Sequence, residues 1–185
     1  MILPISAAGH DGSMAMSFEF DPPLTAELRE QIVGLWAEVT NAGGAVGFVP
    51  PVNAEDIRPT AEKTFAGVED GLDHLLVGRD DGRLVALLFV IDNRFRLKDH
   101  WRVLKRVMVA PGSQGRGYGA AIMREAAEVG RKLGLSGLHV TVREGARTEE
   151  FYARLGYREV GRLPGALRVS AGDDRDEIHM WLALD

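Results

Sequence analysis

The sequence Q114-G-R-G-Y-G119 places three glycines and one arginine in six residues, between the apolar run VMVAP and the helix-like segment AAIMREAAEVGRKLG. Glycines without a Cβ let successive backbone N–H groups converge, and the N-terminus of a helix adds about half a positive charge. Such a loop suits a pyrophosphate, with Arg116 as a counter-charge and Gln114 as an amide donor. A tight turn between a strand and a helix explains the glycines alone equally well.

Two common phosphate-binding loops do not fit this stretch. The dinucleotide fingerprint needs G-x-G-x-x-G and an acidic residue about 20 residues later. Here Gly115, Gly117 and Gly119 have a different spacing, and the strand-like run LHVTV carries no Asp or Glu. The nucleoside-triphosphate loop needs a Lys after its last glycine, and none is present. The pattern that remains is Q-x-x-G-x-G at the start of a long helix.

The elements that would position this loop alternate between strand and helix along the chain. Apolar runs and period-two patterns predict strands at residues 14–20, 74–78, 83–91, 101–110, 136–142, 157–163 and 176–184. Helical spacing predicts helices at residues 24–41, 54–69, 118–134 and 146–156, with Pro59 bending or starting the second. Asp80-Asp81-Gly82 is a hairpin turn signal between two of the strands. This order indicates a mixed α/β fold.

Composition indicates a globular protein of one domain. The chain has 185 residues, of which 45% are hydrophobic and 26% charged, close to the average for soluble domains. We expect residues 1–16 to form a flexible N-terminal leader and residues 17–185 a single domain. No apolar run approaches the ~20 residues of a membrane span, and the first residues do not resemble a secretory signal. We therefore expect a cytoplasmic protein without a membrane partner.

Charge and residue usage exclude several kinds of site. A net charge of -5 argues against a broad nucleic-acid surface, which is normally basic. The absence of cysteine excludes disulfides, thiolate metal sites and a cysteine nucleophile. No histidine pair has metal-ligand spacing on a recognisable helix, so we expect no metal.

Two signatures together resemble the Gcn5-related N-acetyltransferase (GNAT) family. The first is Gln114-x-x-Gly117-x-Gly119 after a hydrophobic strand, and the second is Phe151-Tyr152 ahead of Gly156-Tyr157. The stretches GGAVGF, LKRVMVAP and FYARLGYREVGRLPG are also similar to the tabtoxin-resistance acetyltransferases of this family. The resemblance implies a central mixed, mostly antiparallel sheet of about seven strands, flanked by about four helices.

The resemblance also implies acetyl-CoA as cofactor and direct attack of an amine on its thioester. Tyr152 matches the tyrosine that protonates the leaving thiolate, although it fits simple packing beside Phe151 as well. The Val109 N–H would polarise the thioester carbonyl. Gly145 stands where relatives often carry an asparagine, so that contact is not expected. The residues implied to bind the cofactor are Val107 and Val109 for its pantetheine arm, and Gln114, Gly115, Arg116, Gly117, Tyr118 and Gly119 for its pyrophosphate.

A general base is harder to place from the sequence. Many relatives carry a glutamate on the strand before the loop, yet HWRVLKRVMV has no carboxylate. The titratable residues nearby in the sequence are Asp99, His100, His139 and Glu144, and a chain of water molecules could serve instead. The base stays unassigned at this point.

The resemblance favours a small amine or amino-acid-like acceptor over a protein. Phe48 in GGAVGFVPP could form an apolar wall of the acceptor site or only seal the core. An acidic run could attract a cationic amine or be merely solvated; it comprises Asp173, Asp174, Asp176 and Glu177. The alternatives are acetylation of a protein N-terminus or lysine, and a non-catalytic acyl-CoA sensor. A homodimer would cover the open edge of the sheet.

Overall fold

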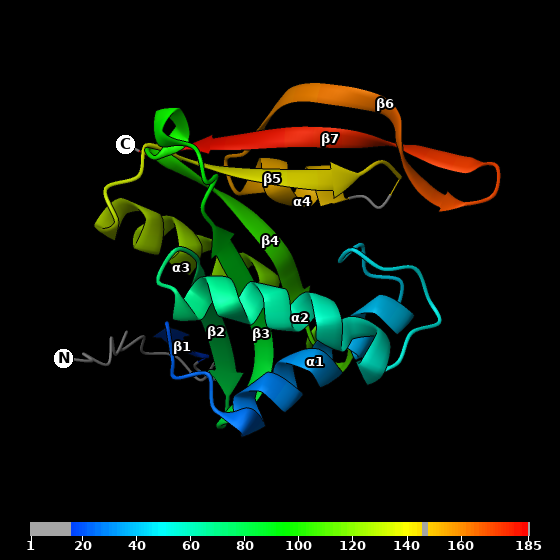
Figure 1. Cartoon of the computed structure of the whole chain (residues 1–185). Coiled ribbons are helices and arrows are strands. Elements are labelled where there is room, and N and C mark those ends of the chain that lie inside the picture. The colour runs from blue at the N-terminus through cyan, green and yellow to red at the C-terminus, as the bar shows by residue number, and fades with distance from the viewer. Residues whose placement is uncertain (1–15, 146–147, 185) are drawn as a thin grey trace.

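The computed structural model describes residues 16–145 and 148–184, and their strands form one seven-stranded sheet with helices on both faces (Figure 1). The strand order is β1-β2-β3-β4-β5-β7-β6, and only the pair β4–β5 is parallel. The strands are β1 (Ser17–Phe20), β2 (His74–Asp80), β3 (Arg83–Ile91), β4 (Trp101–Val109), β5 (Gly137–Arg143), β6 (Arg158–Ser170) and β7 (Asp173–Ala183).

The helices are α1 (Ala26–Asn41), α2 (Ala54–Glu69), α3 (Tyr118–Lys132) and α4 (Thr148–Arg154). Together with the sheet, they confirm the mixed α/β fold, the seven strands and the four helices expected from the sequence. The leader expected at residues 1–16 lies outside the described residues except for Met16. None of the helices in the described ranges is both long and apolar enough to cross a membrane.

Helix α2 begins five residues before its proline. The Asn53 side chain accepts hydrogen bonds from the N–H groups of Glu55 and Asp56, and the Asp56 carboxylate accepts one from the Asn53 N–H. This reciprocal cap satisfies N–H groups that the first turn of a helix leaves free. Pro59 therefore lies inside the helix, which excludes the alternative that it starts the helix.

Strand β6 continues well past the residues expected from the sequence. Pro164 and Gly165 disfavour a strand by local propensity, so the expected strand stopped at residue 163. In the structure β6 pairs with β7 as far as Ser170, with a register irregularity between Leu163 and Leu167. Pairing with β7 overrides the local preference, and the two strands form a long arm at the edge of the sheet (Figure 1).

The sheet has a hydrophobic core on each face. One core packs α3 and α4 against the sheet, and the other packs α1 and α2 against the opposite side. Strand β3 contributes to both, and its residues 84–90 are buried without alternation, as expected for a strand covered on both faces. The two helical layers therefore hold the centre of the sheet rigidly.

The sheet opens between β4 and β5. The two strands pair only between Trp101–Val103 and Gly137–His139, and beyond them β5 pairs with β7 alone. On its other side, β4 has an irregular register opposite Leu87–Phe89 of β3. Arg106 sits at this bulge with a φ of 56°. Figure 1 shows β4 turning away from β5 toward the loop that joins α1 and α2.

The closed end of this opening is held by aromatic side chains over a glycine. Trp181 lies 5.5 Å from Trp101, ring centre to ring centre, with an edge contact. A Cβ at Gly137 would lie 2.0 Å from the Trp181 ring. The absence of a side chain at Gly137 thus lets the Trp181 ring pack against the point where β4 and β5 pair.

We expect Gly137→Ala to lower the free energy of unfolding by about 1–3 kcal/mol, because the added methyl must displace the Trp181 ring. Urea unfolding measures the change. Gly161→Ala in β6 is the matched control, since a Cβ there meets nothing within 4 Å. Equal stabilities of the two variants would show that the Trp181 contact does not secure the strand pair.

Candidate active site

The glycine loop leaves the N-terminus of α3 without a side-chain cap. After a short 3-10 turn at Pro111–Ser113, the chain passes through Gly115 with φ 77° and Gly117 with φ 83°. Both values lie in the left-handed region that favours glycine. Gly117 is the N-cap residue of α3, whereas Thr25 and Asn53 cap α1 and α2 with their side chains. The first N–H groups of α3 are therefore available to a ligand anion.

The loop is also open in space. A Cβ added at Gly112, Gly115 or Gly117 would meet no atom within 4 Å. A ligand can therefore approach the backbone directly at these positions. This geometry fits a bound pyrophosphate, which needs several converging N–H groups and no side chains in its way.

Arg116 and Tyr118 are anchored to the end of β2. The Tyr118 hydroxyl donates a hydrogen bond to the buried Asp80 carboxylate at 2.7 Å, which raises the pKa of Tyr118. Arg116 lies 3.5 Å from the same carboxylate, and its guanidinium lies 5.3 Å from the centre of the Tyr118 ring. Asp80 thus ties the glycine loop to the β2–β3 hairpin and holds the Arg116 side chain beside it.

The end of β4 turns backbone groups toward the opening of the sheet. The Ala110 N–H donates to the Val85 carbonyl of β3 at 2.8 Å. Because successive N–H groups of an extended strand point to opposite edges, the Val109 N–H faces the edge where β5 has diverged. The N–H of Val107, two residues earlier in the strand, faces the same edge. The Gln114 side-chain amide donates to the Val109 carbonyl at 3.4 Å.

Helix α4 reaches the same place from the other side of the opening. A Cβ at Gly119 would lie 3.4 Å from the Phe151 ring and 3.7 Å from the Val109 side chain. The loop, the strand end and α4 therefore meet at Gly119. The Tyr152 ring makes an edge contact with the Phe151 ring, and the ring centres lie 5.1 Å apart. This contact agrees with the interpretation that Tyr152 packs beside Phe151.

Tyr152 is buried, with 8% of its surface exposed. Burial raises the pKa of Tyr152 to about 12, because the charged phenolate is poorly solvated there. The phenol consequently keeps its proton at neutral pH and can act as a hydrogen-bond or proton donor.

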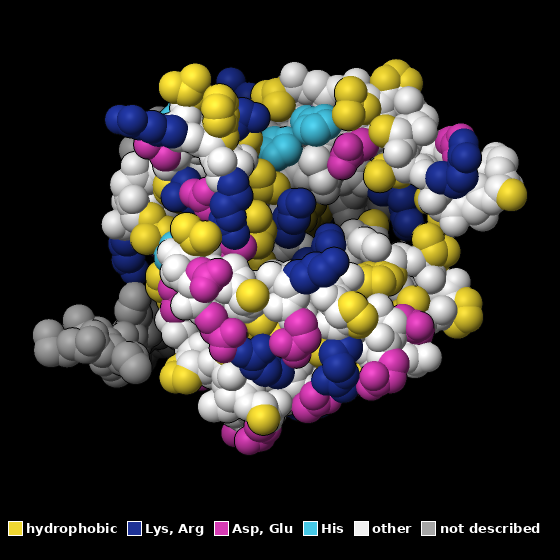
Figure 2. Space-filling model, viewed as in Figure 1, with side chains coloured by type: hydrophobic (Ala, Val, Ile, Leu, Met, Phe, Trp, Pro, Cys, Tyr) yellow, Lys and Arg dark blue, Asp and Glu magenta, His cyan; other side chains and the backbone are white. Residues whose placement is uncertain are grey.

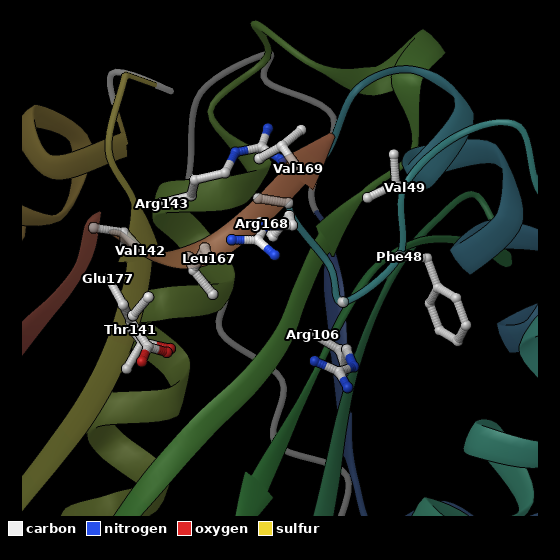
Figure 3. A pocket seen from close by; sticks show the side chains of 13 residues that line it. Phe48, Val49, Arg106, Thr141, Val142, Arg143, Leu167, Arg168, Val169 and Glu177 are labelled. Atoms are coloured by element: carbon white, nitrogen blue, oxygen red, sulfur yellow. The ribbon is translucent and has the colours of Figure 1, made fainter. Parts of the chain in front are cut away.

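A pocket of about 310 Å³ lies at the opening between β4 and β5. Figure 2 shows this hollow between the β5–β7 part of the molecule and the α1–α2 part, with Lys and Arg side chains at its edge. Figure 3 shows Arg106 between the loop residues Phe48 and Val49 and the β5 and β7 residues Thr141 and Glu177. The lining residues are Ala45, Gly47, Phe48, Val49, Arg106, Thr141, Val142, Arg143, Ala166, Leu167, Arg168, Val169 and Glu177.

Phe48 lies against the core and also lines the pocket. Its ring makes an edge contact with Trp36 of the core at 5.9 Å, and its side chain also lines the pocket. The Trp36 indole N–H donates to the Val46 carbonyl at 2.9 Å and so fixes the loop between α1 and α2. The loop is therefore a wall of the pocket that the core holds in place.

Of the carboxylates in the described ranges, only Glu177 lines this pocket. Its carboxylate lies 3.9 Å from His179 Nε2, and His179 Nδ1 lies 3.0 Å from His139 Nε2. The other ring nitrogen of His139 is buried and has no hydrogen-bond partner among the described residues. Desolvation and, to a lesser extent, the charge of His179 lower the pKa of His139. The three side chains form a polar row along β5 and β7.

The remaining candidate bases lie elsewhere. Asp99 and His100 lie just before the start of β4, and the glycine loop follows the end of β4. The nine residues of β4 span about 30 Å at 3.3 Å per residue. Glu144 is partly exposed and pairs with Arg162 at 3.3 Å. Asp99 and His100 are thus distant from the loop, and Glu144 is engaged at the surface.

Most of the acidic run is held in ion pairs. Asp173 pairs with Arg175, Asp174 with Arg168, and Asp176 with Arg162. Glu177 is the member of the run that reaches the pocket. Across residues 16–145 and 148–184, no group of three or more His, Asp or Glu side chains could hold a metal ion.

Sequence patterns had not indicated the roles of Arg106, Arg143 or His179. One signal was present for Arg106, because Lys105-Arg106 interrupts the apolar alternation of β4, as the extra residue of a bulge does. Arg143 and His179 gave no such signal. Their positions depend on the register between β5 and β7, where Thr141 faces His179 and Arg143 faces Glu177.

Comparison with protein families gives one match that covers more than half of the chain. The sequence model of the family described as "Acetyltransferase (GNAT) family" matches residues 48–157. This range includes the second half of the α1–α2 loop, β4, the glycine loop, α3 and α4.

Solved structures with this fold are similar over most of the chain. A protein provisionally described as a phosphinothricin N-acetyltransferase has a TM-score of 0.76 and 17% identity, over 92% of this chain and 99% of that chain. YncA from Salmonella typhimurium, provisionally described as an acetyltransferase and solved with its cofactor acetyl-CoA, has a TM-score of 0.72 and 20% identity, over 92% and 95%. A spermidine N-acetyltransferase chimera of Vibrio cholerae SpeG and hSSAT has a TM-score of 0.73 and 17% identity, over 91% and 95%. At these identities the similarity establishes the fold.

The lowered pKa of His139 predicts a pH dependence of stability. Below its ordinary pKa of 6.5, the unfolded chain binds a proton that the folded chain does not, so stability falls as the pH drops from about 6.5 toward the folded pKa. We expect His139→Gln to lose less thermal stability than the wild type between about pH 7.5 and pH 5.5.

The control is His100→Gln, because the His100 side chain is 58% exposed; it should keep the full wild-type loss. Identical losses in wild type and His139→Gln would remove His139 as a source of the acid sensitivity.

Proposed function

The chain belongs to the acetyltransferase (GNAT) family and is therefore an acetyl-CoA-dependent acetyltransferase, and we propose that its acceptor is the amino group of a small molecule. The observation that carries this proposal is the pocket of about 310 Å³ at the opening of the sheet. Its volume lies at the lower end of the range for small-molecule sites. The pocket is walled by the α1–α2 loop on one side and by β6 on the other.

Acetyl-CoA supplies the thioester-activated acetyl group when it is bound. We assign its pyrophosphate to the backbone of Gln114 to Gly119, because the uncapped start of α3 and the open glycines fit an anion. Arg116, held beside the loop by Asp80, adds positive charge there. We assign the pantetheine arm to the exposed edge of β4 at Val107 and Val109, whose backbone groups lack a strand partner on the β5 side.

Tyr152 is the proposed proton donor to the departing thiolate. Its raised pKa keeps the phenol protonated, so it can deliver a hydrogen bond or a proton where negative charge develops. Helix α4 places it next to Phe151, which contacts the loop and the end of β4.

Glu177 is the proposed acceptor of the proton that the amine loses. It replaces the β4 glutamate of many relatives, which this chain lacks. His179 lies 3.9 Å from its carboxylate, with His139 behind His179. Among the acceptors named for the similar structures, spermidine and phosphinothricin are small amines, which supports an acceptor of this size.

Binding of the cofactor at the glycine loop is tested by thermal shift with acetyl-CoA, CoA, ATP and NAD. We expect acetyl-CoA and CoA to raise the melting temperature selectively, since each binds the folded state. Gly117→Asp should abolish the shift, because it puts a carboxylate where the pyrophosphate lies.

Gly134→Asp at the other end of α3 is the control, since Gly134 has a similar φ of 73° and equal free space; it should keep the shift. Stabilisation by ATP or NAD alone would contradict the assignment of the loop. Binding of acetyl-CoA without acetylation of any small amine would favour the sensor or the protein acetyltransferase instead.

Tyr152→Phe should lower turnover on the order of 100-fold, typical for loss of a general acid, while the thermal shift by CoA is unchanged. Tyr157→Phe is the matched control. Tyr157 is also buried, and its hydroxyl has no hydrogen-bond partner among the described residues, so its loss should leave turnover intact. Turnover is measured as release of CoA thiol, which is unambiguous because the protein has no cysteine. Wild-type turnover in Tyr152→Phe would exclude Tyr152 as the proton donor.

A further inference from the structure

Arg106 is held rigidly at the floor of the acceptor pocket. Its backbone is in the left-handed region with φ 56°, which costs energy in a residue other than glycine. Its guanidinium lies 4.9 Å from the centre of the Trp36 ring. A Cβ at Gly47 would lie only 2.8–2.9 Å from the guanidinium atoms. Trp36 and Gly47 thus both pack against the group and restrict its position.

The Arg106 charge has no counter-ion in the described part of the chain. No hydrogen bond or ion pair connects it to a carboxylate there, and the residue is only partly exposed. Desolvation accordingly lowers the pKa of Arg106. A partly desolvated cation without a carboxylate is unfavourable unless another group compensates it.

Arg143 adds a second cation from the other strand of the opening. It lines the same pocket and forms no ion pair within residues 16–145 and 148–184, although Glu177 is its register neighbour on β7. Arg168, by contrast, is already paired with Asp174 through two hydrogen bonds of 2.7 and 2.8 Å. The pocket therefore presents one carboxylate and two guanidinium groups that form no ion pair with a carboxylate of the described residues (Figure 3).

We propose that Arg106 and Arg143 form an anion-binding subsite, so that the acceptor is an amine that also carries an oxyanion, such as a carboxylate or a phosphonate. This inference rests on the proposed function and specifies its substrate class. Guanidinium groups bind carboxylate and phosphonate oxygens through paired hydrogen bonds. Glu177, in the same pocket, suits the ammonium group of such a zwitterion. Subsites of both signs orient one molecule with its amine toward the opening of the sheet.

The experiment uses matched acceptor pairs with the full chain and acetyl-CoA. Each pair contains an amino acid and its methyl ester or amide, and a third arm contains the corresponding aminophosphonates. We expect kcat/KM to be about 10- to 100-fold higher for the anionic members, as loss of a charge-assisted hydrogen bond predicts. Arg106→Gln and Arg143→Gln should each remove most of this preference, so that the ratio of kcat/KM between the anionic and the neutral member of a pair falls toward one.

Arg131→Gln is the control for a lost positive charge, because Arg131 pairs with Glu128 on α3; it should keep the preference. Arg143 lies on a regular strand, so Arg143→Gln alone tests the subsite if the strained backbone at Arg106 does not tolerate glutamine. A preference for carboxylates or for phosphonates alone identifies the oxyanion.

Equal kcat/KM for anionic and neutral members, or a preference that survives both substitutions, overturns the subsite while the acetyltransferase function stands. If no member is acetylated, the small-amine function fails separately. The subsite is then decided by calorimetric binding of the same pairs to the CoA-loaded protein: binding of the anionic members alone, lost in Arg106→Gln, supports it, and equal or absent binding refutes it.

Discussion

The three-residue contact between β4 and β5 is the constraint on which the rest of the structure depends. Because the two strands share hydrogen bonds only from Trp101 to Val103, the remaining edge of β4 keeps backbone groups that no strand satisfies. Buried backbone groups need partners, so this edge demands a ligand or water. The aromatic contacts at Gly137 hold the closed end, and both cores hold the flanking strands. The opening is therefore a stable feature of the fold and leaves backbone groups of β4 available to a ligand.

One residue connects the opening of the sheet with the chemistry of the pocket. The bulge at Arg106 re-aims β4, as bulges commonly do near active sites, and the same backbone turn places the guanidinium between Trp36 and Gly47. Trp36 also fixes the α1–α2 loop through Val46. A change at any of these positions would alter both the shape of the pocket and the placement of its charge.

The groups proposed to act on the cofactor and those proposed to bind the acceptor lie on opposite faces of the sheet. On the face of α3 and α4, the glycine loop and Tyr152 offer N–H groups and a phenol proton, which suit the cofactor. On the face of α1 and α2, the pocket offers guanidinium groups and the Glu177 carboxylate, which suit the acceptor. Because β4 and β5 diverge between these faces, groups on both sides can reach one reaction centre without movement of the core.

The sequence alone determined the features that depend on neighbouring residues. The glycine loop, the start of α3, the hairpin at Asp81-Gly82 and the paired family signatures are local, because turn and cap geometry is set within a few residues. Only the tertiary structure decided the length of β6, the grouping of Glu177 with His179, and the pocket position of Arg143. These depend on strand register, in which residues some 40 positions apart in sequence become neighbours, such as His139 and His179. Local patterns contain no information about such pairings, because they arise from packing of the whole sheet.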